Sequence, residues 1–111
     1  MSTEDTIREQ VTQHPVVLYM KGTPQFPQCG FSNAAVQMLK GCGVNSFFSV
    51  NVLADDSVRQ GIKDYSNWPT IPQLYVKGEF VGGCDIIREM FQAGELQQLF
   101  ADKGVAVNAA A

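Results

Sequence analysis

The sequence predicts an α/β protein with a mixed four-stranded sheet and helices on both of its faces. Short apolar runs alternate with segments whose apolar residues recur every three or four positions, which indicates strands alternating with helices. Two early strands joined through a helix must pair in parallel, and a later hairpin signal adds antiparallel strands. The chain has 111 residues, of which 45% are hydrophobic, so one core and a single domain over residues 1–111 are expected.

The first half of the chain is predicted to start with a helix and a strand. Residues 3–13 carry two apolar side chains four positions apart and precede a proline, as in a short amphipathic helix capped by Ser2 or Thr3. The apolar run 16–20 is typical of a strand buried on both faces of a sheet. Residues 22–28 contain two prolines and are predicted to form a loop.

A second helix is predicted to begin at Cys29 and to end near two glycines, Gly41 and Gly43. Its apolar residues recur at intervals of three and four: Phe31, Ala34, Ala35, Met38 and Leu39. Residues 47–53 are predicted to form the second strand of the sheet.

The second half is predicted to start with a helix capped by Asp55 or Asp56. Two prolines exclude a helix from residues 68–72. The strands 73–76 and 79–81 flank a Lys-Gly pair, which is typical of a hairpin turn.

The chain is then predicted to end in two helices and a tail. Asp85 is expected to cap the first of these helices, directly after two glycines. The apolar residues of this helix are expected to face inward: Ile86, Ile87, Met90 and Phe91. Gly94 separates it from a last helix that carries Leu96, Leu99 and Phe100. Residues from about 104 onward are predicted to form a flexible tail.

The composition argues against some classes of binding partner and indicates a cellular compartment. Eight basic and eleven acidic residues give a formal net charge of −3, so binding to nucleic acid or to an anionic membrane is not expected. The first fifteen residues lack the apolar segment of a secretory signal, and no stretch approaches the roughly 20 apolar residues of a membrane span. Three cysteines leave at least one thiol without a partner in the chain, which favours a reducing compartment and predicts a cytoplasmic protein.

Cys29 lies where a buried strand passes through a loop into a helix. The N–H groups and the positive dipole of a helix start stabilise an anion, so a thiol there loses its proton more readily. Lys21, at the end of the preceding strand, adds positive charge nearby. Ser32 stands where a C-x-x-C redox motif would have its second cysteine. Cys29 is therefore predicted to act as a monothiol, either with an external thiol or as a metal ligand.

Four motifs follow one another along the chain: Met20-Lys21-Gly22, Cys29-Gly30-Phe31-Ser32, Asn67-Trp68-Pro69-Thr70 and Gly82-Gly83-Cys84-Asp85. In this order and spacing the chain resembles the monothiol glutaredoxins of the CGFS class over nearly the whole domain. The resemblance implies a thioredoxin-like fold with an extra N-terminal helix, glutathione binding and a [2Fe-2S] cluster bridged between two subunits. One departure from the family pattern is Asn51, where relatives often carry an acidic residue.

Glutathione carries a thiol, two carboxylates and an ammonium group, so its site needs cations, one anion and free backbone. The resemblance implies Lys21 and Arg59 for the glycine carboxylate. It implies the main chain of Ile71, beside a proline that is cis in thioredoxin-like proteins, for the ligand backbone. The helix start at Cys84 and Asp85 is expected to receive the glutamyl carboxylate, with the Asp85 carboxylate taking the ammonium group. Cys84 contributes either its backbone or a second redox-active thiol.

The expected cluster sets the expected oligomer. A [2Fe-2S] centre held by thiolates needs four of them. One Cys29 and one glutathione sulfur from each subunit make four in a two-fold homodimer that forms only with cluster and glutathione. Cys42 is expected to be structural. The predicted function is transfer of the cluster to apo iron-sulfur proteins, in iron-sulfur assembly and iron homeostasis.

Two other functions remain open on the sequence. The chain could be a glutathione-dependent oxidoreductase in which Cys29 removes glutathione from protein mixed disulfides and a second glutathione replaces the missing cysteine. It could also be a regulatory partner of a BolA-type protein around a shared cluster. The longer loop between Lys21 and Cys29 is associated, in the CGFS class, with weak reductase activity and a preference for clusters.

Overall fold

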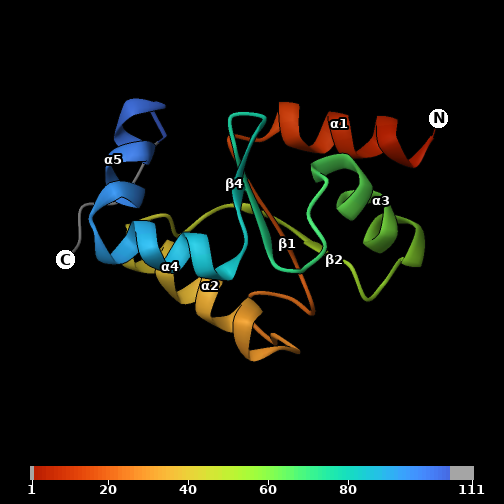
Figure 1. The fold of residues 1–111 in the computed structure, drawn as a ribbon, viewed down its shortest axis with the longest axis horizontal. Helices are drawn as coiled ribbons and strands as arrows, with labels where there is room; N and C mark the ends of the chain where they lie inside the picture. Colours follow the sequence, from red (N-terminus) through yellow and green to blue (C-terminus); the bar gives the residue numbers. More distant parts are fainter. Residues whose placement is uncertain (1, 106–111) are drawn as a thin grey trace.

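The computed structural model describes residues 2–105, in which five helices cover a four-stranded mixed sheet (Figure 1). The strand order is β2-β1-β3-β4. Strand β1 (Val16–Met20) is parallel to β2 (Phe48–Asn51) and antiparallel to β3 (Gln73–Val76), and β4 (Glu79–Gly82) is antiparallel to β3. The predicted class, with one parallel crossover and one hairpin, is confirmed.

The helices lie on opposite faces of the sheet (Figure 1). Helices α1 (Thr3–Gln13) and α3 (Asp56–Ser66) pack against each other on one face. On the other face, α2 (Gly30–Gly41) packs against α4 (Cys84–Gln92), which in turn contacts α5 (Glu95–Asp102). None of the helices within residues 2–105 has the length and hydrophobicity to span a membrane.

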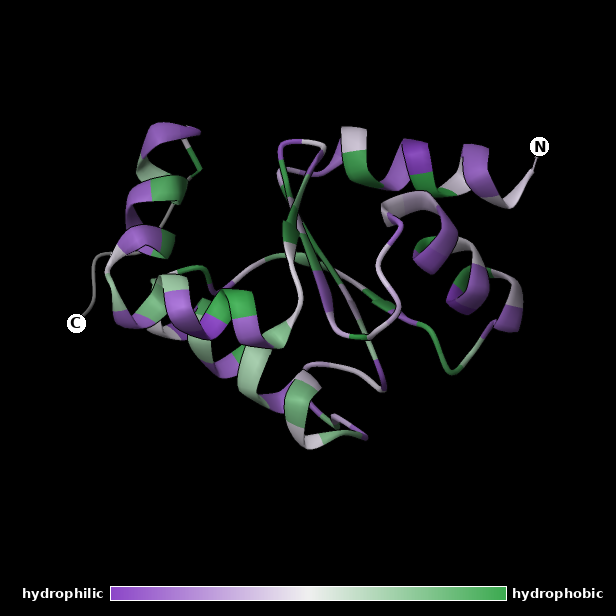
Figure 2. Ribbon diagram, viewed as in Figure 1, coloured by the Kyte–Doolittle hydropathy of each residue, from purple (hydrophilic) through white to green (hydrophobic). Residues whose placement is uncertain are grey.

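Every residue of β1 and β3 is buried, because these two strands form the centre of the sheet. Successive side chains point to opposite faces of a strand, so each strand serves two cores. Leu18 and Leu74 pack with α2, α4 and α5, whereas Tyr19 and Tyr75 pack with α1 and α3. Figure 2 shows the resulting pattern, with hydrophobic residues concentrated in the central strands and hydrophilic residues on the outer faces of the helices.

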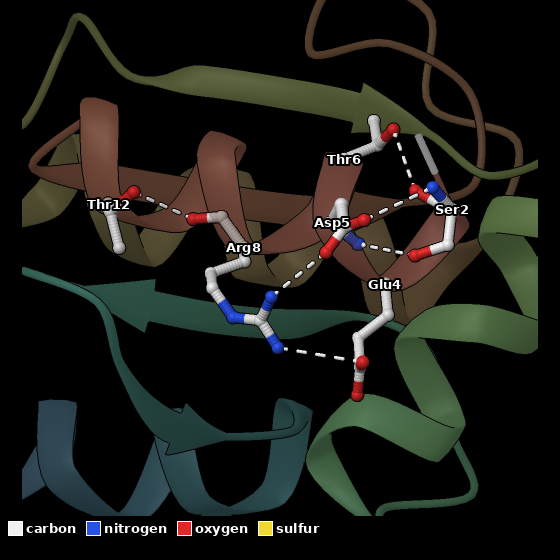
Figure 3. A network of polar contacts seen from close by, with 6 residues as sticks. All are labelled: Ser2, Glu4, Asp5, Thr6, Arg8 and Thr12. Carbon is white, nitrogen blue, oxygen red and sulfur yellow. Dashed lines mark hydrogen bonds and ion pairs between the residues drawn. The ribbon is translucent and has the colours of Figure 1, made fainter.

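Ser2, one of the two predicted caps, caps α1 through a reciprocal pair of hydrogen bonds (Figure 3). The Ser2 hydroxyl accepts from the Asp5 N–H at 3.1 Å, and the Asp5 carboxylate accepts from the Ser2 N–H at 3.3 Å. The Ser2 N–H is the main reason why the pKa of Asp5 lies below its usual value. Arg8 reaches back to Glu4 and Asp5, so the first two turns are held by local polar contacts.

One sequence expectation about the helices was wrong. Asp85 does not cap α4: Gly83 is the N-cap, and Asp85 is the second residue of the helix with an exposed side chain. The helix starts early because the chain turns at Gly82, whose φ of +154° suits glycine. Phe31 shares the spacing of the apolar face of α2, yet it is 59% exposed, because it lies in the first turn of the helix, at the rim of a cavity.

The ends of two other elements also differ from the expectation. The second strand stops at Asn51, because the Asn51 side chain rather than a neighbouring strand accepts the Leu53 N–H. The N–H of Val105 donates to the Phe100 carbonyl at 2.9 Å, and its side chain packs against the core. The rest of the tail predicted from about residue 104, residues 106–111, lies outside the described residues.

Candidate functional site

A cavity of about 390 Å³ opens where β1, α2, the loop before β3 and the start of α4 meet. Five of the six residues predicted for the site line it: Lys21, Cys29, Ile71, Cys84 and Asp85. These residues are up to 64 positions apart in the sequence, so the fold alone brings them to one place.

Arg59, the sixth predicted residue, does not line this cavity, whereas Lys63 does. Both lie on α3, and residues four positions apart share one face of a helix. Lys63 is one turn closer to the loop before β3, so it supplies the second cation of the cavity wall. The spacing of Arg59 and Lys63 was the sequence signal that could have indicated this alternative.

Aromatic residues form part of the cavity rim, which the sequence analysis did not anticipate. Phe31 and Trp68 both line the cavity and are both exposed. Trp68 can approach the start of α4 because position 83 is glycine: a Cβ on Gly83 would lie 2.9 Å from the indole nitrogen. The doubled glycine in the sequence was a signal of such a close approach.

The thiol of Cys29 lies at the N-cap of α2 and is partly exposed. Its pKa lies below that of an ordinary cysteine, mainly because the backbone N–H of Ser32 stabilises the thiolate. The N–H of Phe31, the positive charge of Lys21 and the Ser32 hydroxyl act in the same direction, and together they outweigh the opposing effect of partial burial. This is the arrangement of a nucleophilic or metal-binding thiolate.

The other two thiols have different surroundings. Cys84 is buried, and burial raises its pKa, against the opposing charge of Arg88. Cys42 ends α2 as its C-cap and packs partly against the core, and burial raises its pKa as well. All three cysteines are free, and Cys29 is the partly exposed thiol whose pKa is lowered rather than raised.

The loop that leads to Cys29 is closed by backbone hydrogen bonds. The Gln28 N–H donates to the Lys21 carbonyl at 2.9 Å, and Thr23 and Phe26 exchange two backbone bonds of 3.3 and 3.1 Å. Gly22 has a φ of +89°, and a Cβ there would lie 2.5 Å from the Phe26 carbonyl oxygen. The loop therefore requires glycine at position 22 and holds Lys21 beside Cys29.

A second wall of the cavity is the segment before β3. Its Ile71–Pro72 peptide bond is cis, as the resemblance implied. Gln73 is fully buried, and its side-chain nitrogen donates to the carbonyls of Trp68 at 3.0 Å and Thr70 at 3.1 Å. A single buried amide thus holds the segment in which Trp68, Pro69, Thr70 and Ile71 line the cavity.

The third wall is the start of α4, where Gly83, Cys84 and Asp85 line the cavity. No side chain caps this helix, so the N–H groups of its first turn have no partner from a capping residue. The Asp85 carboxylate forms a long ion pair with Arg88, at 3.9 Å, and its exposed side chain remains accessible to a positively charged ligand group.

The chemistry of the donors limits how a metal can bind. Residues 2–105 contain no group of three or more His, Cys, Asp or Glu side chains placed to hold a metal ion. Cys29 is the partly exposed thiol at the cavity, where Cys84 is buried, and it can supply one thiolate. A metal group with four thiolate ligands would therefore need sulfur atoms from outside this chain.

Comparison with known proteins places the chain among well-defined relatives. The glutaredoxin family model matches residues 16–81. Glutaredoxin 4 of Pasteurella multocida is 54% identical over 102 residues, which cover 92% of this chain and 93% of that protein. The mitochondrial monothiol glutaredoxin-5 of Lachancea kluyveri is 55% identical over 102 residues, which cover 90% of this chain and 71% of that protein.

A solved structure agrees with these sequence relations. The solution structure of reduced poplar apo GrxS14 superimposes with a TM-score of 0.78 at 52% sequence identity, and the match covers 93% of this chain and 94% of that one. The likeness confirms the thioredoxin-like fold that the resemblance implied.

Proposed function

The chain belongs to the glutaredoxin family, among its monothiol members, and from this premise we propose that it binds glutathione and carries a [2Fe-2S] cluster to acceptor proteins. The observation that supports this proposal most directly is the readily ionised thiol of Cys29 at the edge of a cavity with two cations. Ser32 takes the place of the second cysteine of a C-x-x-C motif, so Cys29 has no partner thiol within that motif, and we propose glutathione as the external sulfur.

Glutathione suits the three walls of the cavity. We place its glycine carboxylate near Lys21 and Lys63, with Arg59 one turn away as a further cation. The main chain of Ile71 would pair with the ligand backbone. The uncapped start of α4, at Cys84 and Asp85, would take the glutamyl carboxylate on its N–H groups and the ammonium group on the Asp85 carboxylate.

The cluster would be cargo shared between two copies of the chain. Each subunit would offer the Cys29 thiolate and hold one glutathione whose sulfur is the second ligand, which makes four ligands in a two-fold dimer. The cluster supplies iron and sulfide for an acceptor protein. Phe26, Phe31 and Trp68 are 75%, 59% and 37% exposed, and the last two line the cavity, which suits contact with a second copy around the shared site.

The same exposed surface would serve the further partners. Apo iron-sulfur proteins would approach Cys29 to receive the cluster, and a BolA-type protein would replace one subunit around it. Ligands that are not covalently part of the chain can exchange, so a cluster held by glutathione is suited to delivery rather than to permanent storage.

The test is anaerobic reconstitution with iron, sulfide and glutathione, followed by the visible spectrum and the mass in solution. We expect a coloured dimer that needs glutathione and that returns to a colourless monomer when glutathione is removed. Cys29→Ser should abolish both the colour and the dimer, whereas the matched variant Cys42→Ser should keep them. A colourless monomer from native protein would falsify the proposal.

The low pKa of Cys29 also favours a second candidate, reduction of mixed disulfides. The Cys29 thiolate would attack the glutathione sulfur of a protein mixed disulfide, and the protein thiolate would leave. A glutathione thiolate would then attack the new disulfide and release glutathione disulfide, with Cys29 restored. A glutathione-coupled reduction assay separates the candidates: we expect weak turnover, and rapid turnover without reconstitution of a cluster would favour the enzyme.

A further inference from the structure

Two side-chain oxygens hold the peptide that follows β1. The Ser32 hydroxyl accepts from the Lys21 N–H at 3.1 Å, and the Asn51 amide oxygen accepts from the Gly22 N–H at 3.0 Å. The sheet pairing of β1 ends at Met20, so neither N–H has a strand partner. Side chains from α2 and from the end of β2 therefore take the place of the ladder at these two residues.

We propose that Ser32 and Asn51 are positioning residues that together hold Lys21–Gly22, and thereby keep the Lys21 cation and the Cys29 sulfur in a fixed arrangement. This inference rests on the proposed role of Cys29 as the sulfur that binds glutathione or a cluster. Neither residue needs to touch the ligand, because both would act through the backbone that carries Lys21.

Ser32 connects the two groups directly. It is fully buried, and its hydroxyl uses one lone pair for the Lys21 N–H, so its own proton is left to donate. Ser32 also lies in the first turn of α2, three residues after the N-cap Cys29. One buried side chain thus links the Lys21 peptide to the helix start that carries the sulfur.

Asn51 acts from the opposite side. Its amide oxygen accepts a second hydrogen bond, from the Leu53 N–H at 3.0 Å, so the oxygen is itself held by the turn after β2. The loop beyond Gly22 is closed by the bond from the Gln28 N–H to the Lys21 carbonyl. A shift of Lys21–Gly22 would therefore pass through Gln28 to the next residue, Cys29.

The test follows alkylation of Cys29 by iodoacetamide as a function of pH, in apo protein with Cys42→Ser and Cys84→Ser as background. We expect Ser32→Ala to move the midpoint to higher pH and to slow alkylation at neutral pH by about threefold or more, which corresponds to half a pH unit. Asn51→Leu, which removes both hydrogen bonds at similar volume, should shift the midpoint in the same direction. The matched surface variant Asn45→Ala should not shift it.

The combined variant Ser32→Ala/Asn51→Leu tests whether the two residues act on one peptide. Shared action predicts a combined shift smaller than the sum of the two single shifts. Additive shifts, or folded single variants with unchanged pH profiles, would overturn the proposal and leave both residues with a merely structural role.

A measurement on the native chain covers variants that fail to fold. The Lys21 and Gly22 amides should exchange with deuterium slowly, like sheet amides, although they lie outside the ladder. Fast exchange would contradict the proposal. None of these measurements uses glutathione or a cluster, so a failure of this inference and a failure of the proposed function are told apart by separate experiments.

Discussion

Cys29, Cys42 and Cys84 are the same side chain in three surroundings, and the surroundings decide their chemistry. The N–H groups of an open helix start and a nearby lysine lower the pKa of Cys29, whereas burial raises the pKa of the other two. A difference in pKa between thiols is a difference in the fraction present as reactive thiolate at a given pH.

Iodoacetamide at neutral pH should therefore label Cys29 well before Cys42 and Cys84. Lys21→Gln removes a cation that stabilises the thiolate, so it should raise the pKa of Cys29 and slow its labelling, while Lys77→Gln in the exposed β3–β4 turn should not. Timed labelling followed by peptide mass spectrometry measures both effects. Faster labelling of Cys84 than of Cys29 would contradict this ranking.

Gln73 shows how one buried polar residue can shape a cavity that it does not line. Its side-chain nitrogen is the donor for the Trp68 and Thr70 carbonyls, whereas its side-chain oxygen has no hydrogen-bond partner among residues 2–105. The side-chain NH2 group of Gln73 therefore makes the hydrogen bonds that stabilise the segment before β3.

Gln73→Leu should weaken glutathione binding, measured by calorimetry, and lower the free energy of unfolding by about 1–3 kcal/mol, because two carbonyls lose their donor. Gln73→Glu keeps the size of the side chain but replaces the donor with an acceptor, so its effect should be larger. Unchanged affinity in both variants would show that the segment holds its shape without Gln73.

At the scale of elements, the contact between α1 and α3 depends on the absence of a side chain. A Cβ on Gly61 of α3 would lie 2.6 Å from the Thr3 methyl group and 3.2 Å from the end of Ile7. Glycine costs about 1 kcal/mol in a helix relative to alanine, so it is retained here against helix propensity, for close packing. The two helices lie side by side in Figure 1.

Gly61→Ala should lower the free energy of unfolding by about 1 kcal/mol, because overpacking of about 1–3 kcal/mol exceeds the gain in helix propensity. Thr3→Ser removes the clashing methyl group, so the double variant Gly61→Ala/Thr3→Ser should recover the free energy of unfolding that the single variant loses. Urea unfolding of the single and double variants measures both changes. A more stable single variant would mean that Thr3 moves aside at little cost.

At the scale of the whole molecule, aromatic side chains of the sheet form a layer that faces α1 and α3. Tyr19 and Tyr75 meet edge to face with ring centroids 5.7 Å apart, and both are buried. The Tyr19 hydroxyl donates to the Gln10 side chain at 2.8 Å. Burial raises the pKa of Tyr75 to about 12 and also raises the pKa of Tyr19.

This layer predicts a loss of stability at alkaline pH. The pKa of Tyr75 is higher in the folded than in the unfolded chain, where it is about 10. The stability linked to this difference is fully present below about pH 10, and it is lost as the pH rises from about 10 toward the folded value. The urea midpoint of native protein should therefore decline above about pH 10. The urea midpoint of Tyr75→Phe should decline less steeply with pH. An equal decline of the midpoint in the two proteins would contradict a role of Tyr75.

The order and type of the elements could be predicted because they depend on neighbours in the sequence. The apolar run of β1, the prolines before β3 and the cap at Asp55 each act within a few residues, and all are found as expected. The cap predicted at Asp85 failed because the competing signal, the turn at Gly82 and Gly83, set the helix start earlier.

The sequence by itself determined which thiol stands at a helix start: Cys29 follows a strand and a loop and directly precedes α2, and Ser32 excludes a C-x-x-C motif. Only the tertiary structure decided that Lys63 lines the cavity in place of Arg59, that Cys84 is buried and that Asn51 holds Gly22. The first set of features depends on spacing along the chain. The second depends on how far each helix is rotated and which distant backbone meets it, and packing of the whole chain fixes both.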